Sequence, residues 1–168
     1  FCGMTERYNP AVMKLKELLD PESLVSIKFS RYSTVAANIK IPVLFDLGIH
    51  DLDLYLYLLE RKKFPTDYNV FKKSKSYYIM AEQNNILSIF EWSHESHKRE
   101  RKINALQKNI VYEVDLIDQT VLSYEANSVV KNLYVDKAQP LKEILAAFLF
   151  GKTNDAKLAH EFMFDVME

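Results

Sequence analysis

The stretch that decides the fold is IVYEVDL at residues 110–116, in which every second residue is apolar and Glu113 and Asp115 stand between them. A period of two residues is typical of a β-strand with one buried face. The same alternation occurs in ILSIFEWS at residues 86–93. Residues 67–136 consist of such runs separated by the polar breaks KSKS, QNN and KN. This pattern predicts about six consecutive antiparallel strands.

Helical signals lie on both sides of this strand region. Asn9 is a capping residue followed by proline at the first helical position, and Pro21 ends the predicted helix. Residues 42–60 are mostly apolar without an internal breaker, which predicts a long buried helix. The remaining predicted elements are a strand at residues 24–31, a helix from Pro140 that Gly151 ends, and a last helix capped near Asn154.

This order of elements predicts an α+β fold: an open, largely antiparallel sheet with helices packed on one face. The strands are partly apolar on both faces, so the face without helices needs a cover. We therefore expect a partner subunit or a further domain on that face.

Composition excludes several classes of protein. The 168 residues, 48% of them apolar, suit one domain with one core, and 22 Lys and Arg against 23 Asp and Glu leave no basic field for nucleic acid. Three glycines are too few for a dinucleotide fingerprint or a P-loop, so a Rossmann domain is absent. No apolar run approaches the roughly 20 residues of a membrane span.

The ends and the cysteine content add two expectations. Cys2 is the one cysteine, which points to a reducing compartment and makes the cytoplasm the expected location. The chain begins with Phe1 rather than Met, so we expect a fragment of a longer reading frame.

The long helix carries the candidate site. At about 100° per residue, Asp46, His50, Asp53 and Tyr57 fall within about 60° of one another on its surface. The i, i+4 spacing would let the Asp46 carboxylate contact the His50 imidazole and raise its basicity, as suits a general acid or base. The alternative is a histidine that only satisfies hydrogen bonds in the core. We favour a structural hydrogen-bonding role for Asp53.

Two other groups are weaker candidates. His94 and His97 would point to opposite faces of a strand and could not share one metal ion, so no metal site is expected. The basic cluster at residues 98–102 is better explained by a solvated strand edge than by a ligand site.

Two runs carry a family resemblance. ERYNPAV at residues 6–12 and DLGIHDLD at residues 46–53, with the strand ending at Arg31 between them, resemble the C-terminal domain of the Gfo/Idh/MocA oxidoreductases. Residues 98–125 and the segment from Pro140 resemble the branch that acts on nucleotide sugars, such as UDP-N-acetylglucosamine 3-dehydrogenases.

The resemblance implies NAD- or NADP-dependent oxidation or reduction at a sugar carbon, in a cleft between this domain and a missing N-terminal Rossmann domain that binds the cofactor. It implies that His50 is the acid/base and that Asp46 orients the substrate or the histidine. Arg7, Tyr8 and Asn9 would lie at the substrate cleft, and Arg7 and Arg31 would contact a diphosphate.

Two hypotheses remain open. The first is the substrate-binding and oligomerisation domain of such an enzyme, inactive alone and self-associating through its open sheet face. The second is a non-catalytic interaction module derived from the same fold. A working site requires Asp46 and His50 to face an open cleft.

Overall fold

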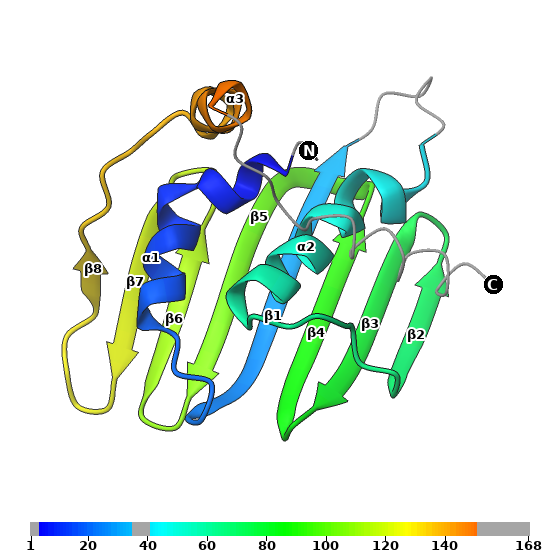
Figure 1. The fold of residues 1–168 in the computed structure, drawn as a ribbon. Helices are drawn as coiled ribbons and strands as arrows, with labels where there is room; N and C mark the ends of the chain where they lie inside the picture. The colour runs from blue at the N-terminus through cyan, green and yellow to red at the C-terminus, as the bar shows by residue number, and fades with distance from the viewer. Residues whose placement is uncertain (1–3, 35–40, 151–168) are drawn as a thin grey trace.

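The computed structural model describes residues 4–34 and 41–150, and these form an eight-stranded sheet with helices on one face (Figure 1). The strand order is β2-β3-β4-β1-β5-β6-β7-β8. Neighbouring strands are antiparallel except β1 and β4, which run parallel. The predicted α+β class, with an open and largely antiparallel sheet, is confirmed.

The strands have these bounds: β1 Leu24–Thr34, β2 Tyr68–Lys73, β3 Ser76–Gln83, β4 Ile86–Ser93, β5 Glu95–Gln107, β6 Ile110–Asp115, β7 Thr120–Glu125 and β8 Lys131–Leu133. The helical elements are η1 Thr5–Tyr8, α1 Pro10–Leu18, η2 Leu44–Gly48, α2 Ile49–Leu58 and α3 Pro140–Leu149. After residue 67 the described chain thus contains seven strands, one more than predicted.

Helix α1 begins as its sequence predicts. The Asn9 side chain accepts a hydrogen bond from the backbone N–H of Ala11 at 3.1 Å, and Pro10 occupies the first helical position. Val12 and Leu15 are fully buried against the sheet, where α1 lies over β6 and β7 (Figure 1). The helix is therefore fixed by a cap at one end and by an apolar face along its length.

The core lies between the helices and the sheet. On the sheet side, alternation turns Phe29, Phe90 and Ile103 toward the helices, and all three are fully buried. The rings of Phe29 and Phe90 stack with their centroids 5.1 Å apart. Burial of this kind supplies most of the stability of a domain of this size.

The predicted long helix exists, but its first part is not α-helical. The five residues of η2 form π-helical turns, and α2 continues from them. A Cβ added to Gly48 would lie 3.0 Å from Cζ3 of Trp92, so glycine lets the helix approach the sheet closely at this point. The π-helical turns and the glycine bring the start of α2 against β4.

The closing region is described only in part. Helix α3 begins at Pro140 as predicted, and it contacts η1 beyond the end of the sheet (Figure 1). Ile144 and Ala147 are its buried residues. The predicted helix near Asn154 lies outside the described residues. Within the part of the chain that the structure describes, no helix has the length and apolar character needed to span a bilayer.

The second face of the sheet carries no described helix (Figure 1). Side chains that alternate with the core residues point to this face, and several large apolar ones are exposed. They are Phe71, Tyr78, Met80, Leu106 and Tyr124, which together we call the open-face residues. Their exposure agrees with the expectation that something covers this face.

Candidate functional site

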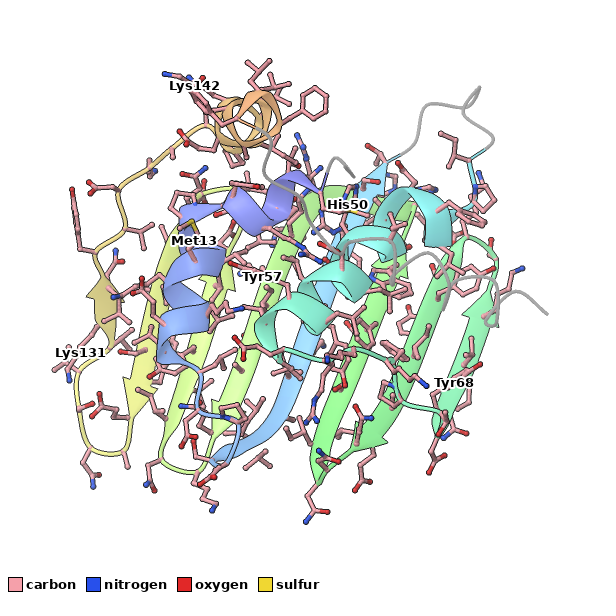
Figure 2. The ribbon with its side chains drawn as sticks, in the orientation of Figure 1. Met13, His50, Tyr57, Tyr68, Lys131 and Lys142 are labelled. Atoms are coloured by element: carbon pink, nitrogen blue, oxygen red, sulfur yellow. The ribbon has the colours of Figure 1, made fainter. Side chains whose placement is uncertain are left out.

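A pocket of about 350 Å³ opens near the end of β1. Three segments line it, and the residues that they contribute are 31–34 from β1, Asp46, Leu47 and His50 from η2 and α2, and Arg99 and Arg101 from β5. Figure 2 shows His50 at this end of the sheet, beside the start of α2. Asp46 and His50 therefore share one open pocket and are not covered by the strands that the structure describes.

Asp46 is held by a residue that the sequence analysis did not assign to the site. Its Oδ2 lies 2.9 Å from Nε2 of His94, whose side chain is 4% exposed, whereas that of Asp46 is 40% exposed. The backbone N–H of His94 donates to the carbonyl oxygen of Lys75 at 3.1 Å. His94 thus fixes one carboxylate oxygen and leaves the group open to the pocket.

The expected contact between Asp46 and His50 does not form. In an α-helix the side chains i and i+4 lie above one another, but a π-helical turn repeats after five residues. Asp46 lies within η2, so its side chain diverges from that of His50 and meets His94. The predicted contact between Asp46 and His50 is therefore wrong, because the turns that carry Asp46 are π-helical and not α-helical.

His50 is kept neutral by its surroundings. Burial lowers its pKa below 6.5, and the Arg31 guanidinium lowers it further, whereas Asp51 and Glu6 only partly oppose them. The expectation of a more basic imidazole is therefore wrong. Nδ1 is buried and has no hydrogen-bond partner among the described residues, which leaves Nε2 as the ring nitrogen available to the pocket.

Arg31 is the centre of a buried ion-pair network. Its Nε and Nη2 donate to Oδ1 of Asp51 at 2.9 and 2.7 Å, and its Nη1 donates to Oε1 of Glu6 at 3.1 Å. Trp92 donates its Nε1–H to Oδ2 of Asp51 at 2.9 Å. Burial acts to lower the pKa of Arg31, but the two carboxylates outweigh it and raise the pKa. Arg31 reaches the pocket wall, yet most of its donors are committed to carboxylates.

Arg7 has a similar internal partner. Its Nε and Nη2 donate to Oδ2 and Oδ1 of Asp53 at 2.8 and 2.6 Å, and its guanidinium lies 5.2 Å from the centre of the Tyr57 ring. The structural role favoured for Asp53 is confirmed. The predicted substrate contact of Arg7 remains untested.

Tyr8 and Asn9 lie away from the pocket wall. Asn9 caps α1, and its Nδ2 donates to the carbonyl oxygen of Leu116 at 2.9 Å. Tyr8 ends η1 and is half-buried. Residues 7–9 are not among the described residues that line the pocket. Their predicted substrate contacts stay predictions, and any such contact would lie outside this cavity.

The basic cluster lies largely at a strand edge, as expected, but two of its residues also line the pocket. β5 pairs with β1 along most of its length but with β6 only along residues 102–107, so residues 98–101 have no described partner strand on their second side. Alternation turns Arg99 and Arg101 toward the pocket, whereas Lys102 lies on the other face and pairs with Glu113 at 3.1 Å. The two arginines were missed as site residues, although alternation along the predicted strand was the signal that could have found them.

No metal cluster forms among the described residues. Within residues 4–34 and 41–150, no group of three or more His, Cys, Asp or Glu side chains has the arrangement needed to hold a metal ion. His94 contacts Asp46, and His97 is exposed on β5.

Comparison with known proteins finds likeness at the level of structure. No family model and no curated protein matches the sequence. UDP-N-acetylglucosamine 3-dehydrogenase GnnA from Acidithiobacillus ferrooxidans matches with a TM-score of 0.80 at 18% identity, over 98% of this chain and 58% of that one. A dehydrogenase (MviM) from Clostridium difficile matches with 0.77 at 13% identity, over 98% and 60%.

A proposed NADPH-dependent oxidoreductase from Desulfitobacterium hafniense matches with a TM-score of 0.73 at 17% identity, over 95% of this chain and 58% of that one. The chain thus spans 58 to 60% of the length of these three structures. At such identities the likeness establishes the fold. The chain has the fold of the C-terminal domain of the Gfo/Idh/MocA oxidoreductases, as the sequence resemblance implied.

Proposed function

We propose that this chain is the substrate-binding and oligomerisation domain of an NAD- or NADP-dependent oxidoreductase that acts on a hydroxyl of a sugar or nucleotide sugar. Residues 1–168 would form one domain, C-terminal to a Rossmann domain that holds most of the cofactor, in a cytoplasmic enzyme. The match to 58% of the length of a UDP-N-acetylglucosamine 3-dehydrogenase supports this division.

The observation that carries the proposal is the pairing of a neutral imidazole with an exposed carboxylate in one pocket. His50 has a lowered pKa and an available Nε2, so it can accept a proton near neutral pH. Asp46 has one oxygen fixed by His94 and lies 40% exposed at the same pocket. This combination suits proton transfer. His50 would take the proton of a substrate hydroxyl, and Asp46 would orient the substrate that donates it.

Oxidation of an alcohol by hydride transfer requires a base at the hydroxyl and a group that orients the substrate. A hydride leaves a carbinol carbon only as the proton of its hydroxyl is removed, and a bound nicotinamide would supply the hydride acceptor. His50 would accept the hydroxyl proton at Nε2. The positive charge of the buried Arg31 would disfavour the protonated imidazole and so favour release of that proton. Asp46 would accept a hydrogen bond from a neighbouring hydroxyl and so orient the sugar.

Replacement of His50 tests the proposal. In the full reading frame that encodes this chain, assayed with NAD or NADP and UDP-N-acetylglucosamine, His50→Ala should lower kcat about 100-fold or more. The acid limb of the wild-type kcat/KM profile should lie below pH 6.5, because the pKa of His50 is lowered. His97→Ala, an exposed histidine outside the pocket, is the control. Equal activity of both variants would refute the role of His50.

The open sheet face favours a second candidate, a non-catalytic self-association module. The open-face residues are large, apolar and exposed, which suits contact with a second copy of the chain. Self-association belongs to both candidates, so the pocket is the feature on which they differ. The openness of the pocket that Asp46 and His50 share supports the enzyme. A full-length protein that self-associates but oxidises no sugar would instead support the module.

A further inference from the structure

The pocket wall formed by β5 carries guanidinium groups with unused donors. Arg99 is exposed, and its guanidinium makes no ion pair or hydrogen bond with another described residue. Arg101 is 34% exposed and donates through Nη1 to Oε1 of Glu6 at 2.9 Å. Its other guanidinium N–H groups find no acceptor among the described residues. The two arginines therefore present several donors to one cavity.

Two carboxylates beside these arginines, those of Glu6 and Asp51, are buried and do not line the pocket, whereas that of Asp46 does. Glu6 is buried, and its Oε1 is shared between Arg31 and Arg101 at 3.1 and 2.9 Å. Asp51 is also buried and is held by Arg31 and Trp92. These carboxylates hold Arg31 and Arg101 in place and are not among the residues that line the pocket.

The arginines are also close enough to repel one another. Arg31 and Arg101 are direct partners across the β1–β5 register. Burial lowers the pKa of Arg101, and Arg31 lowers it further, whereas Glu6 opposes them and Arg99 adds a smaller repulsion. A polyanion in the pocket would reduce this repulsion and accept the unused N–H groups.

We infer that Arg99 and Arg101 bind the diphosphate of a nucleotide-sugar substrate, an inference that rests on the proposed function. Arg7 and Arg31, which the sequence resemblance favoured for this contact, are largely committed to Asp53, Asp51 and Glu6. A guanidinium group can donate two parallel hydrogen bonds to two oxygens of a phosphate. Because the same pocket contains Asp46 and His50, one ligand could contact the arginines and present its sugar hydroxyl to the imidazole.

Calorimetric titration of the 168-residue chain tests this assignment. The probes are UDP-N-acetylglucosamine, inorganic pyrophosphate and NADP, because a dinucleotide also carries a diphosphate. Arg99→Gln should raise the Kd of UDP-N-acetylglucosamine and of pyrophosphate about tenfold, since hydrogen bonds to charged groups are lost. Arg99 is exposed and without a described partner, so this variant should retain the wild-type Tm.

Lys102→Gln is the matched control, because Lys102 lies on the same strand but on the opposite face, paired with Glu113. It should change either Kd less than about twofold. If Arg99→Gln and Lys102→Gln raise the Kd equally, the effect is one of net charge and the assignment is overturned. An effect of Arg99→Gln on NADP binding alone would overturn it as well. Diphosphate binding that depends on Arg99, in a full-length protein that oxidises no sugar, would uphold the anion site and refute the proposed function.

Discussion

At the scale of single residues, His94 determines how Asp46 faces the pocket. The two residues are 48 positions apart in the sequence, and His94 is buried whereas Asp46 is partly exposed. A carboxylate with one oxygen fixed can present the other in a defined direction, and small losses of orientation cost rate steeply. We therefore regard His94 as a positioning residue.

This role predicts different effects for two replacements of His94. In the full-length enzyme, His94→Ala should lower kcat about tenfold or more with little change in KM, because Asp46 loses its orientation. His94→Gln should recover most of the rate, since its amide can donate from nearly the same place as Nε2. The measurement is steady-state kinetics, with Tm recorded for both variants. Equal loss in both, in step with a lowered Tm, would show that His94 serves packing alone.

The structural roles of some residues were predictable from the sequence around them. Asn9 caps a helix that begins at the next residue, and Asp53 was favoured as a structural partner and pairs with Arg7. The contact of Asp46 with His94 was not predictable, because it joins a helix to a strand end that only the tertiary fold brings together. Alternation gives the face of β5 on which Arg99 lies, but its place at the pocket depends on the pairing of β5 with β1, which the sequence pattern does not give.

At the scale of elements, the same distinction applies. Alternation of apolar residues predicted β4 and β6, because one face of each strand is buried by helices and the period of two follows directly. The apolar run at residues 42–60 predicted a helix but not its π-helical turns. The close approach of Gly48 to Trp92, 44 positions away in the sequence, was not predictable either, because the two residues meet only in the fold.

Gly48 should therefore resist replacement by alanine. Alanine would favour the helix by about 1 kcal/mol, but its Cβ would lie 3.0 Å from the Trp92 ring. Trp92 is fully buried and donates a hydrogen bond to Asp51, so its ring cannot move away easily. Overpacking of this kind costs about 1 to 3 kcal/mol. We expect Gly48→Ala to lower the free energy of unfolding by about 1 kcal/mol, measured by urea denaturation.

A double-mutant cycle provides the control for this prediction. In a Trp92→Phe background the ring is smaller, so Gly48→Ala should there cost less, with Cδ1 of Leu44, also 3.0 Å from the added Cβ, as the remaining close contact. A stabilising effect of Gly48→Ala in the wild-type background would contradict the close approach of the helix to β4.

At the scale of the whole molecule, the layers of the fold separate the two proposed activities. The helices lie on one side of the sheet (Figure 1), and Asp46, Leu47 and His50 of the pocket come from them. The open-face residues point to the other side of the sheet. A second copy bound at the open face would therefore leave the pocket accessible. Self-association and substrate binding should be separable by mutation.

Met80 and Met13 provide a matched pair for testing the self-association. Both are exposed, at 42% and 49%, but Met80 is an open-face residue and Met13 lies on α1, as Figure 2 shows for Met13. A glutamate at position 80 would place an unpaired charge inside an apolar interface, which is costly. Met80→Glu should raise the dissociation constant of the oligomer at least about 100-fold, whereas Met13→Glu should leave it unchanged. Light scattering across a range of protein concentrations measures both, and a wild-type chain that stays monomeric at high concentration would refute association through this face.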